Sequence, residues 1–152
     1  MPEVGEPAPE FTSKSDAGAT VALRDLRGKK VVLYFYPQDD TPGCTREACD
    51  FRDSQTAVQA SGAVVLGVSP DSVASHAAFK QKFGLPFLLL SDEDKAIVTA
   101  YGVWKPRTRD GQTVMRTERT TFIIDERGII THVFPQVKVD GHVAEVLAAL
   151  AS

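Results

Sequence analysis

The chain has 152 residues, of which 43% are hydrophobic and 24% are charged, and its net charge is −3. This length suits one domain over residues 1–152, and the apolar fraction supports a packed core, which excludes a disordered chain. The weak negative charge argues against a general binder of nucleic acid or membrane surfaces, and no apolar run approaches the length of a membrane span.

The first 60 residues predict a small hairpin, a buried strand and a helix. Residues 9–23, PEFTSKSDAGATVAL, are typical of a short hairpin that turns at SDAGA. The run from Lys30 to Tyr36 is apolar almost throughout, which indicates a strand buried on both faces. Pro37 ends this strand, and we expect a helix from about Pro42 to Ala60.

The middle of the chain alternates strands with helices, in the order strand 62–69, helix 71–83 and strand 86–91. A further helix should begin in SDED, with Ser91 as its N-cap and Asp94 three residues on, which is a capping-box pattern. Gly102 stands where that helix should end.

The last third of the chain predicts a hairpin and a final helix. Residues 103–118 show no clear period, whereas TTFIID and GIITHVF predict two strands joined by the short turn ERG. A helix should start near Asp140, with its apolar stripe formed by Val143, Val146, Leu147 and Leu150. Alternating strands and helices indicate an α/β fold with a central sheet flanked by helices, and the late hairpin makes that sheet mixed.

Both cysteines of the chain, Cys44 and Cys49, follow the first buried strand. Thr41 is a favourable N-cap, Pro42 suits the first helical position, and Gly43 lets another group approach the backbone closely. The free N–H groups and dipole of a helix start favour an anion, so they would stabilise a Cys44 thiolate, which is the nucleophilic form. A small buried apolar side chain is the alternative for Cys44, and Thr41 could be only a cap.

The spacing of the two cysteines does not fit an ordinary disulfide. Five residues of helix give a rise of roughly 7.5 Å and a turn of about 140°, so the two Cα atoms would lie roughly 8.6 Å apart, beyond the ~7 Å limit for a disulfide. A bond between Cys44 and Cys49 therefore needs the first turns of the helix to unwind, which suits a transient catalytic bond. The residues alone leave it equally open that Cys49 never pairs and only packs.

A zinc site is a poor explanation of the cysteines. Zinc needs four ligands, or three and a water, whereas His76, His132 and His142 are scattered with no ligand-like spacing. We expect no metal and no other cofactor. The histidines should lie at the surface or at the edge of the core.

The segment FYPQDDTPGCTREACDFRD resembles the peroxiredoxins, whose active-site pattern Pro-x-x-x-Thr-x-x-Cys is matched by Pro37, Thr41 and Cys44. It is most similar to the peroxiredoxin Q, or bacterioferritin comigratory protein, subfamily, in which a second cysteine follows five residues on, as Cys49 does here. The resemblance extends over nearly the whole chain, through LLSDED, YGVW, RTTFIID and GHVAEVLAAL. It implies a thioredoxin-like fold with a small N-terminal hairpin addition.

The resemblance also implies roles for site residues. Cys44 would be the peroxidatic cysteine, Cys49 the resolving cysteine of an intramolecular disulfide, and Arg119 the active-site arginine that faces Cys44. Thr41 would contact a substrate oxygen, and Pro37 would shape the pocket. Glu47 would have a helix-surface or a hydrogen-bonding role. The sequence around Arg119 would by itself suggest only another solvated charge.

The implied activity is reduction of hydrogen peroxide and organic hydroperoxides, followed by recycling with thioredoxin or a glutaredoxin. We expect a cytoplasmic monomer, since no secretory signal is visible and cytosolic cysteines stay reduced, with no nucleic-acid or membrane partner. Two alternatives remain: a thiol-disulfide oxidoreductase, although Cys-x-x-Cys is absent, and a non-enzymatic redox sensor or holdase. The basic stretch KPRTRDGQTVM departs from the family pattern, so the resemblance does not define the substrate rim or docking surface.

Overall fold

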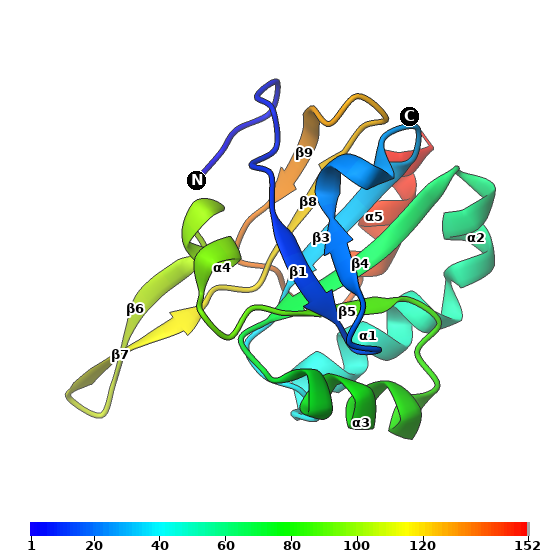
Figure 1. Ribbon diagram of the computed structural model, residues 1–152. Coiled ribbons are helices and arrows are strands. Elements are labelled where there is room, and N and C mark those ends of the chain that lie inside the picture. Colours follow the sequence, from blue (N-terminus) through cyan, green and yellow to red (C-terminus); the bar gives the residue numbers. More distant parts are fainter. Residues whose placement is uncertain (152) are drawn as a thin grey trace.

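A seven-stranded mixed sheet forms the centre of the computed structural model, which describes residues 1–151 (Figure 1). Its strands lie in the order β2-β1-β5-β4-β3-β8-β9. Their bounds are β1 Thr12–Ser15, β2 Thr20–Ala22, β3 Lys30–Phe35, β4 Ala63–Ser69, β5 Leu88–Ser91, β8 Thr120–Ile124 and β9 Ile130–Phe134. β3, β4 and β5 run parallel, whereas the β1–β2 and β8–β9 hairpins are antiparallel. The predicted mixed sheet, N-terminal hairpin and late hairpin are therefore confirmed.

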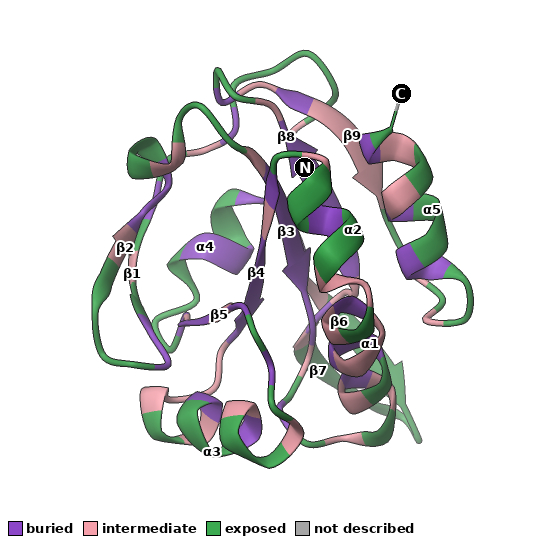
Figure 2. Cartoon of the chain, turned by 90° about the vertical axis from the view of Figure 1, so that its right-hand side faces the viewer, coloured by how far each residue is buried: buried purple, intermediate pink, exposed green. Residues whose placement is uncertain are grey.

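Alternate residues of β3 face two separate apolar cores. Val32 and Tyr34 pack on the side covered by α1, α2, α3 and α5, and Leu33 and Phe35 pack on the side of α4 and the 3-10 helix η1. The helices span α1 Pro42–Asp53, α2 Gln55–Ala60, α3 Val73–Phe83, α4 Ala96–Ala100, α5 His142–Leu150 and η1 Leu23–Leu26. Figure 2 shows β3 as a buried strand in the middle of the molecule. This explains why its sequence is apolar at successive positions.

The helix predicted from Pro42 to Ala60 is in fact two helices. α1 ends at Asp53 and α2 begins at Gln55, with Ser54 between them at φ −105° and ψ 11°. The Ser54 N–H donates to the carbonyl of Phe51 at 3.1 Å, three residues back, which tightens the chain out of α-helical geometry. Both cysteines lie in α1.

The predicted capping role of Ser91 is wrong. Ser91 is the last residue of β5, and its hydroxyl donates to the carbonyl of Asp71. α4 begins at Ala96, and the Asp92 carboxylate accepts the N–H groups of Ile97 and Val98 at 3.0 and 2.9 Å. A charged acceptor that takes two N–H groups is a stronger cap than a hydroxyl already committed to a carbonyl.

Gly102 ends α4 as predicted. Its φ of 70° lies in the left-handed region, where glycine carries no Cβ penalty. The N–H of Val103 then donates to the carbonyl of Val98, which closes the helix end. The predicted final helix is also confirmed, with Val143, Val146 and Leu150 buried.

The stretch without a clear period forms a hairpin of its own. β6 Trp104–Arg109 pairs antiparallel with β7 Gln112–Thr117 in a separate two-stranded sheet, which extends away from the body in Figure 1. Asp110 and Gly111 form the turn, both with positive φ, which is the backbone that Asp-Gly hairpin turns adopt. Sequence analysis predicted neither the turn nor the strands. The outer residues of the strands are exposed on both faces and show no apolar alternation.

Within residues 1–151, no helix combines the length and the apolar composition that crossing a bilayer requires.

Candidate active site

The loop between β3 and α1 places Cys44 in the first turn of a helix. Thr41 is the N-cap residue, and its carbonyl accepts the N–H of Thr45 at 2.8 Å. Its side chain does not cap the helix, however, so that prediction is wrong: the loop brings the carbonyl of Gln38 within 2.9 Å of the hydroxyl, which donates to it instead. No acceptor within residues 1–151 takes the N–H groups of Gly43 and Cys44. Two backbone donors are thus available beside the thiol.

Arg119 lies against the sulfur of Cys44, as the resemblance implied. Cys44 is 2% exposed, and Nη2 of Arg119 donates to its Sγ at 3.4 Å. Gly43 makes room for this contact, because a Cβ at that position would lie 3.2 Å from Nη2. A guanidinium at this distance stabilises the thiolate form of the sulfur.

Glu47 holds the other side of the same guanidinium. Oε1 of Glu47 accepts Nη1 of Arg119 at 2.8 Å, and Glu47 is fully buried one turn after Cys44. The helix-surface alternative for Glu47 is therefore wrong, and its hydrogen-bonding role is confirmed. Burial raises the pKa of Glu47 from 4.5 to about 7, against the opposing charge of Arg119. Oε2 has no partner within residues 1–151.

The charge of Arg119 is secured by the same contacts. Burial acts against the charged guanidinium, but the negative charges of Glu47 and Cys44 outweigh it, so the pKa of Arg119 is raised. The guanidinium therefore remains positive beside the sulfur at any pH at which the protein works.

Cys49 lies five residues beyond Cys44 in the same helix, and both cysteines are free thiols. Cys49 is half-buried, whereas Cys44 is buried. Because α1 runs through both residues, their Cα atoms keep the helical separation of roughly 8.6 Å, which a disulfide cannot bridge.

The loop that carries Thr41 is anchored by a buried ion pair. Asp39 accepts Nδ1–H of His76 at 2.7 Å, and it also accepts the hydroxyls of Tyr36 and Ser75. Nε2 of His76 lies 2.9 Å from the carbonyl of Leu90 and donates to it, so both ring nitrogens carry protons. Burial disfavours the charged imidazole, but the hydrogen bond and charge of Asp39 outweigh it, and the pKa of His76 is raised.

The structure places two histidines differently from the prediction. His76 and His142 are 0% and 1% exposed, so they are not surface or core-edge residues, whereas His132 is half-buried. Each buried ring has polar partners on both nitrogens: Nε2 of His142 lies 2.8 Å from the Thr121 hydroxyl, and its Nδ1 lies 2.9 Å from Glu145. These partners make complete burial possible.

A metal ion could be held by one group of side chains, Asp39, Asp71 and His76, whose ligand atoms lie within 4.8 Å of one another. Asp71 accepts the N–H of Asp39 and the hydroxyl of Ser69. Hydrogen bonds already engage the oxygens and ring nitrogens that would face an ion, which favours the ion pair as the role of this group.

Sequence reasoning missed Asp39 and His76. Two signals were available: Asp39 stands in the loop beyond the carboxyl end of a buried strand, and His76 lies three residues before Phe79 on one helix face.

A groove of about 490 Å³ lies between the body and the β6–β7 hairpin. Pro37 and Arg119 line it, together with Lys105, Arg107 and Arg116 of the hairpin. Pro37 therefore lines the same groove as Arg119. A substrate that enters the groove meets Arg119, the residue that contacts Cys44.

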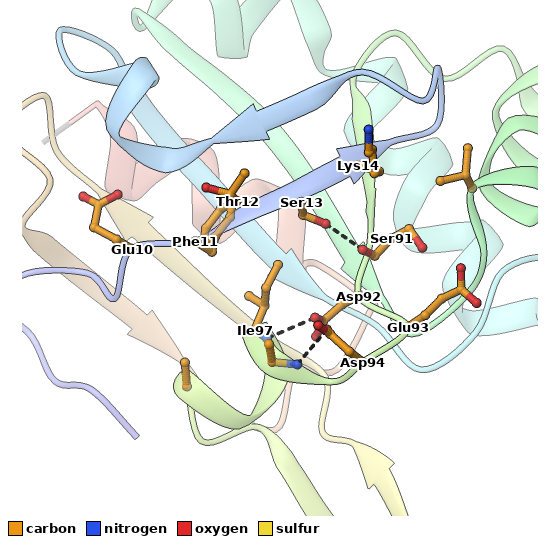
Figure 3. A pocket seen from close by; sticks show the side chains of 13 residues that line it. Glu10, Phe11, Thr12, Ser13, Lys14, Ser91, Asp92, Glu93, Asp94 and Ile97 are labelled. Atoms are coloured by element: carbon orange, nitrogen blue, oxygen red, sulfur yellow. Dashed lines mark hydrogen bonds between the residues drawn. The ribbon is translucent and has the colours of Figure 1, made fainter.

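A second cavity, of about 460 Å³, lies between β1 and the loop from β5 to α4 (Figure 3). Asp92, Glu93 and Asp94 line it, and Asp92 is engaged in capping α4. None of the residues around Cys44 lines this cavity.

A buried cysteine beside an arginine at a helix start, on a mixed sheet flanked by helices, defines a thiol-dependent peroxidase of the peroxiredoxin class. The comparisons agree: residues 4–133 match the model of the AhpC/TSA family, and the chain belongs to that family. It is 57% identical over 148 residues to "Putative peroxiredoxin bcp" of Coxiella burnetii, which covers 97% of this chain and 98% of that one. It is 50% identical over 148 residues to "Peroxiredoxin Bcp" of Bacillus subtilis, which covers 97% and 94%.

A solved structure of the Xanthomonas campestris bacterioferritin comigratory protein superposes with a TM-score of 0.90 at 40% identity, over 93% of this chain and 90% of that chain. That structure is described as giving insights into the protein's alkyl peroxide reduction activity. The thioredoxin-like fold and the peroxiredoxin Q/Bcp subfamily predicted from the sequence are both confirmed.

Proposed function

We propose that Cys44 is the peroxidatic cysteine of this thiol peroxidase and that Cys49 resolves it. The observation that carries the proposal is the 3.4 Å contact between Arg119 Nη2 and Cys44 Sγ. This contact keeps a positive charge beside the sulfur of Cys44. Within residues 1–151, the side chain of Cys49 forms no hydrogen bond and no ion pair. The thiolate, and therefore the nucleophile, is assigned to Cys44.

In the first step, the Cys44 thiolate attacks the terminal oxygen of a hydroperoxide. The S–O bond forms as the O–O bond breaks, so the sulfur is oxidised to a sulfenic acid and the remaining oxygen leaves as an alkoxide or hydroxide. That oxygen takes up a proton and departs as an alcohol or as water. Charge builds on it in the transition state, where Arg119 and the N–H groups of Gly43 and Cys44 can donate to it.

Thr41 acts on the substrate as a hydrogen-bond acceptor and not as a donor. The hydrogen of Oγ1 is donated to the carbonyl of Gln38, so the oxygen can accept the hydrogen of a hydroperoxide. This contact would orient the terminal oxygen toward Cys44. Pro37 contributes an apolar wall to the groove and offers no N–H to compete for the substrate.

In the second step, the thiol of Cys49 attacks the sulfenic sulfur of Cys44. A disulfide forms, and the sulfenic oxygen leaves as a second water. A protein dithiol then reduces this disulfide. One thiolate of the dithiol attacks a sulfur of the disulfide and forms a mixed disulfide, which releases the other cysteine. The second thiol of the dithiol attacks the mixed disulfide, so that both cysteines return as thiols and the dithiol becomes a disulfide. Thioredoxin or a glutaredoxin fits this chemistry.

The substrate range we propose is hydrogen peroxide together with organic hydroperoxides. The volume of the groove, about 490 Å³, leaves room for an alkyl group, and the similar Xanthomonas campestris protein is described by its alkyl peroxide reduction activity. We also propose a cytoplasmic monomer with one domain over residues 1–152. The length suits one domain, and two cysteines near one helix start suit a catalytic pair in a reducing compartment better than a structural disulfide.

The test is a coupled assay in which peroxide drives oxidation of NADPH through thioredoxin reductase and thioredoxin. Hydrogen peroxide and cumene hydroperoxide should both sustain turnover, and the protein should not reduce insulin disulfides. Insulin reduction without peroxide consumption would instead indicate a thiol-disulfide oxidoreductase. Oxidation of Cys44 without turnover by any dithiol would indicate a redox sensor.

A further inference from the structure

All four cations of the β6–β7 hairpin lie on one face. The register pairs Lys105 with Arg116, Arg107 with Val114 and Arg109 with Gln112. Cross-strand partners and alternate residues point to the same side of a sheet. We call this side the basic face; it consists of Lys105, Arg107, Arg109, Gln112, Val114 and Arg116. The opposite face carries no charged residue.

Most of the positive charge of the basic face is not neutralised by acidic residues of the same chain. Residues 104–117 hold four of the 17 Lys and Arg and one of the 20 Asp and Glu, so the hairpin is +3 and the rest of the chain is −6. Lys105 pairs with Glu118 at 3.1 Å. Arg107, Arg109 and Arg116 form no ion pair with any residue in 1–151. Like charges on one face repel one another, so the face favours an anionic partner from outside.

This face borders a groove that contains Arg119. Lys105, Arg107 and Arg116 line that groove together with Arg119, whose guanidinium contacts Cys44. Residues 106–115 are all exposed, and the hairpin reaches out from the body (Figure 1). A molecule bound on the basic face therefore lies next to the site where the disulfide is made and must be reduced.

The dimensions of the face suit a protein rather than a small anion. Alternate residues of a strand lie roughly 7 Å apart, so the row Lys105–Arg107–Arg109 extends over about 14 Å, farther than one carboxylate or phosphate can reach. Val114, 51% exposed, lies among these arginines. Arginines around an apolar side chain are typical of protein–protein interfaces.

We propose that the basic face docks the acidic surface of the protein dithiol that reduces the Cys44–Cys49 disulfide. The inference rests on the proposed recycling step. Docking places the partner's thiolate at the disulfide, where it attacks one sulfur and its second thiol completes the exchange. The long-range attraction raises the rate of encounter more than it lengthens the life of the complex.

The test compares two variants with equal changes of charge. Arg109→Glu with Gln112→Glu alters the basic face outside the groove, and Arg24→Glu with Gln59→Glu makes the same change at exposed positions elsewhere. Turnover is measured with whichever of thioredoxin and glutaredoxin supports the wild type, and with dithiothreitol. In low salt, kcat/KM for the protein dithiol should fall about fivefold in the hairpin variant only, and the difference should vanish at about 0.5 M salt. Turnover with dithiothreitol should be the same in all three proteins.

Three results would overturn the inference. Equal kcat/KM for the protein dithiol in both variants would refute docking on the basic face, and the proposed peroxidase activity would still stand. A loss confined to carboxylate-bearing hydroperoxides would assign the face to the substrate. If dithiothreitol but no protein dithiol turned over the wild type, the proposed recycling step would itself be wrong, and the inference would end with it.

Discussion

The carboxylate of Glu47 accepts a hydrogen bond from Nη1 of Arg119 at 2.8 Å, and this bond fixes the position from which Nη2 of the same guanidinium contacts Cys44. Cys44 and Glu47 share one face of α1, while Arg119 comes from the chain just before β8. One rigid, planar cation thus connects a buried carboxylate to a buried sulfur.

Removing this cation should slow the peroxide step. In Arg119→Ala the sulfur loses its positive neighbour and the leaving oxygen loses a donor, so the rate of Cys44 oxidation should fall by about 10²–10³. Arg119→Lys should recover little, because one ammonium cannot contact both Glu47 and Cys44. Stopped-flow measurement of a single oxidation by hydrogen peroxide checks both. A rate within a few-fold of wild type for Arg119→Ala would remove Arg119 from the reaction.

Glu47 should make the stability of the fold depend on pH. Its pKa is about 7 in the folded chain and 4.5 ordinarily, so between these values the folded state binds more protons than the unfolded state. The free energy of unfolding therefore falls as the pH rises through this window, by about 3 kcal/mol. Glu47→Gln cannot titrate but still accepts from Arg119, and should gain stability relative to wild type over the same rise.

Urea unfolding at about pH 5 and about pH 8 measures the effect of Glu47. Glu93→Gln is the control, since Glu93 is exposed. A constant difference between Glu47→Gln and wild type at the two pH values would contradict the raised pKa of Glu47.

The two cysteines should behave differently when replaced. Cys44→Ser should abolish peroxide consumption, because a hydroxyl at that place is not ionised. Cys49→Ser should still be oxidised once, and its sulfenic acid should persist long enough to be trapped by a dimedone reagent and weighed by mass spectrometry. Failure to trap Cys44 in Cys49→Ser would reverse or remove the assigned roles.

Formation of the disulfide should unwind the start of α1. The helix holds Cys44 and Cys49 too far apart, so residues 43 to 51 must leave helical geometry in part. Phe51 is fully buried and stacks on Tyr34 with ring centroids 4.8 Å apart, so unwinding should stop before it. Amide hydrogen exchange should show lost protection from Thr45 to Cys49 in oxidised protein and retained protection at Ser54, whose N–H donates to the carbonyl of Phe51. Equal protection in both redox states, with the bond confirmed by mass, would disprove this unwinding.

The Asp39–His76 pair should contribute most to stability at low pH. Asp39→Asn leaves a buried imidazolium without its counter-ion and should cost about 3–5 kcal/mol. Because the pKa of His76 is raised on folding, this contribution is complete below the ordinary value of about 6.5 and fades as the pH rises through the folded value. Asp40→Asn is the matched control, since Asp40 is an exposed neighbour whose ion pair with Lys82 should count for little. Equal losses in the two variants would refute the role of the buried pair.

The residues that the sequence located well are those whose neighbours in space are also neighbours in the chain. The start of α1 was readable because Thr41, Pro42 and Gly43 each suit one helix position. The strands of the central sheet were readable because both of their faces are apolar. Local pattern is enough where packing repeats with the period of the element.

Contacts between distant segments could not be read in this way. Arg119 meets Cys44 across 75 positions, and only the family resemblance indicated it. Asp39 and His76, 37 positions apart, were missed because each looked like an ordinary polar residue until the fold joined them. The β6–β7 hairpin was missed for a different reason. Little of it packs on the body, so its sequence lacks the apolar pattern that a core-facing strand would show.

The base of that hairpin has one more consequence. Trp104 and Thr117 face each other in the register, so the chain leaves the body and returns to it at adjacent points. A two-residue turn between them would close the chain without moving β8 or α4. The arm can therefore be shortened or lengthened while the contacts between Cys44, Arg119 and Glu47, none of which involves a hairpin residue, are kept.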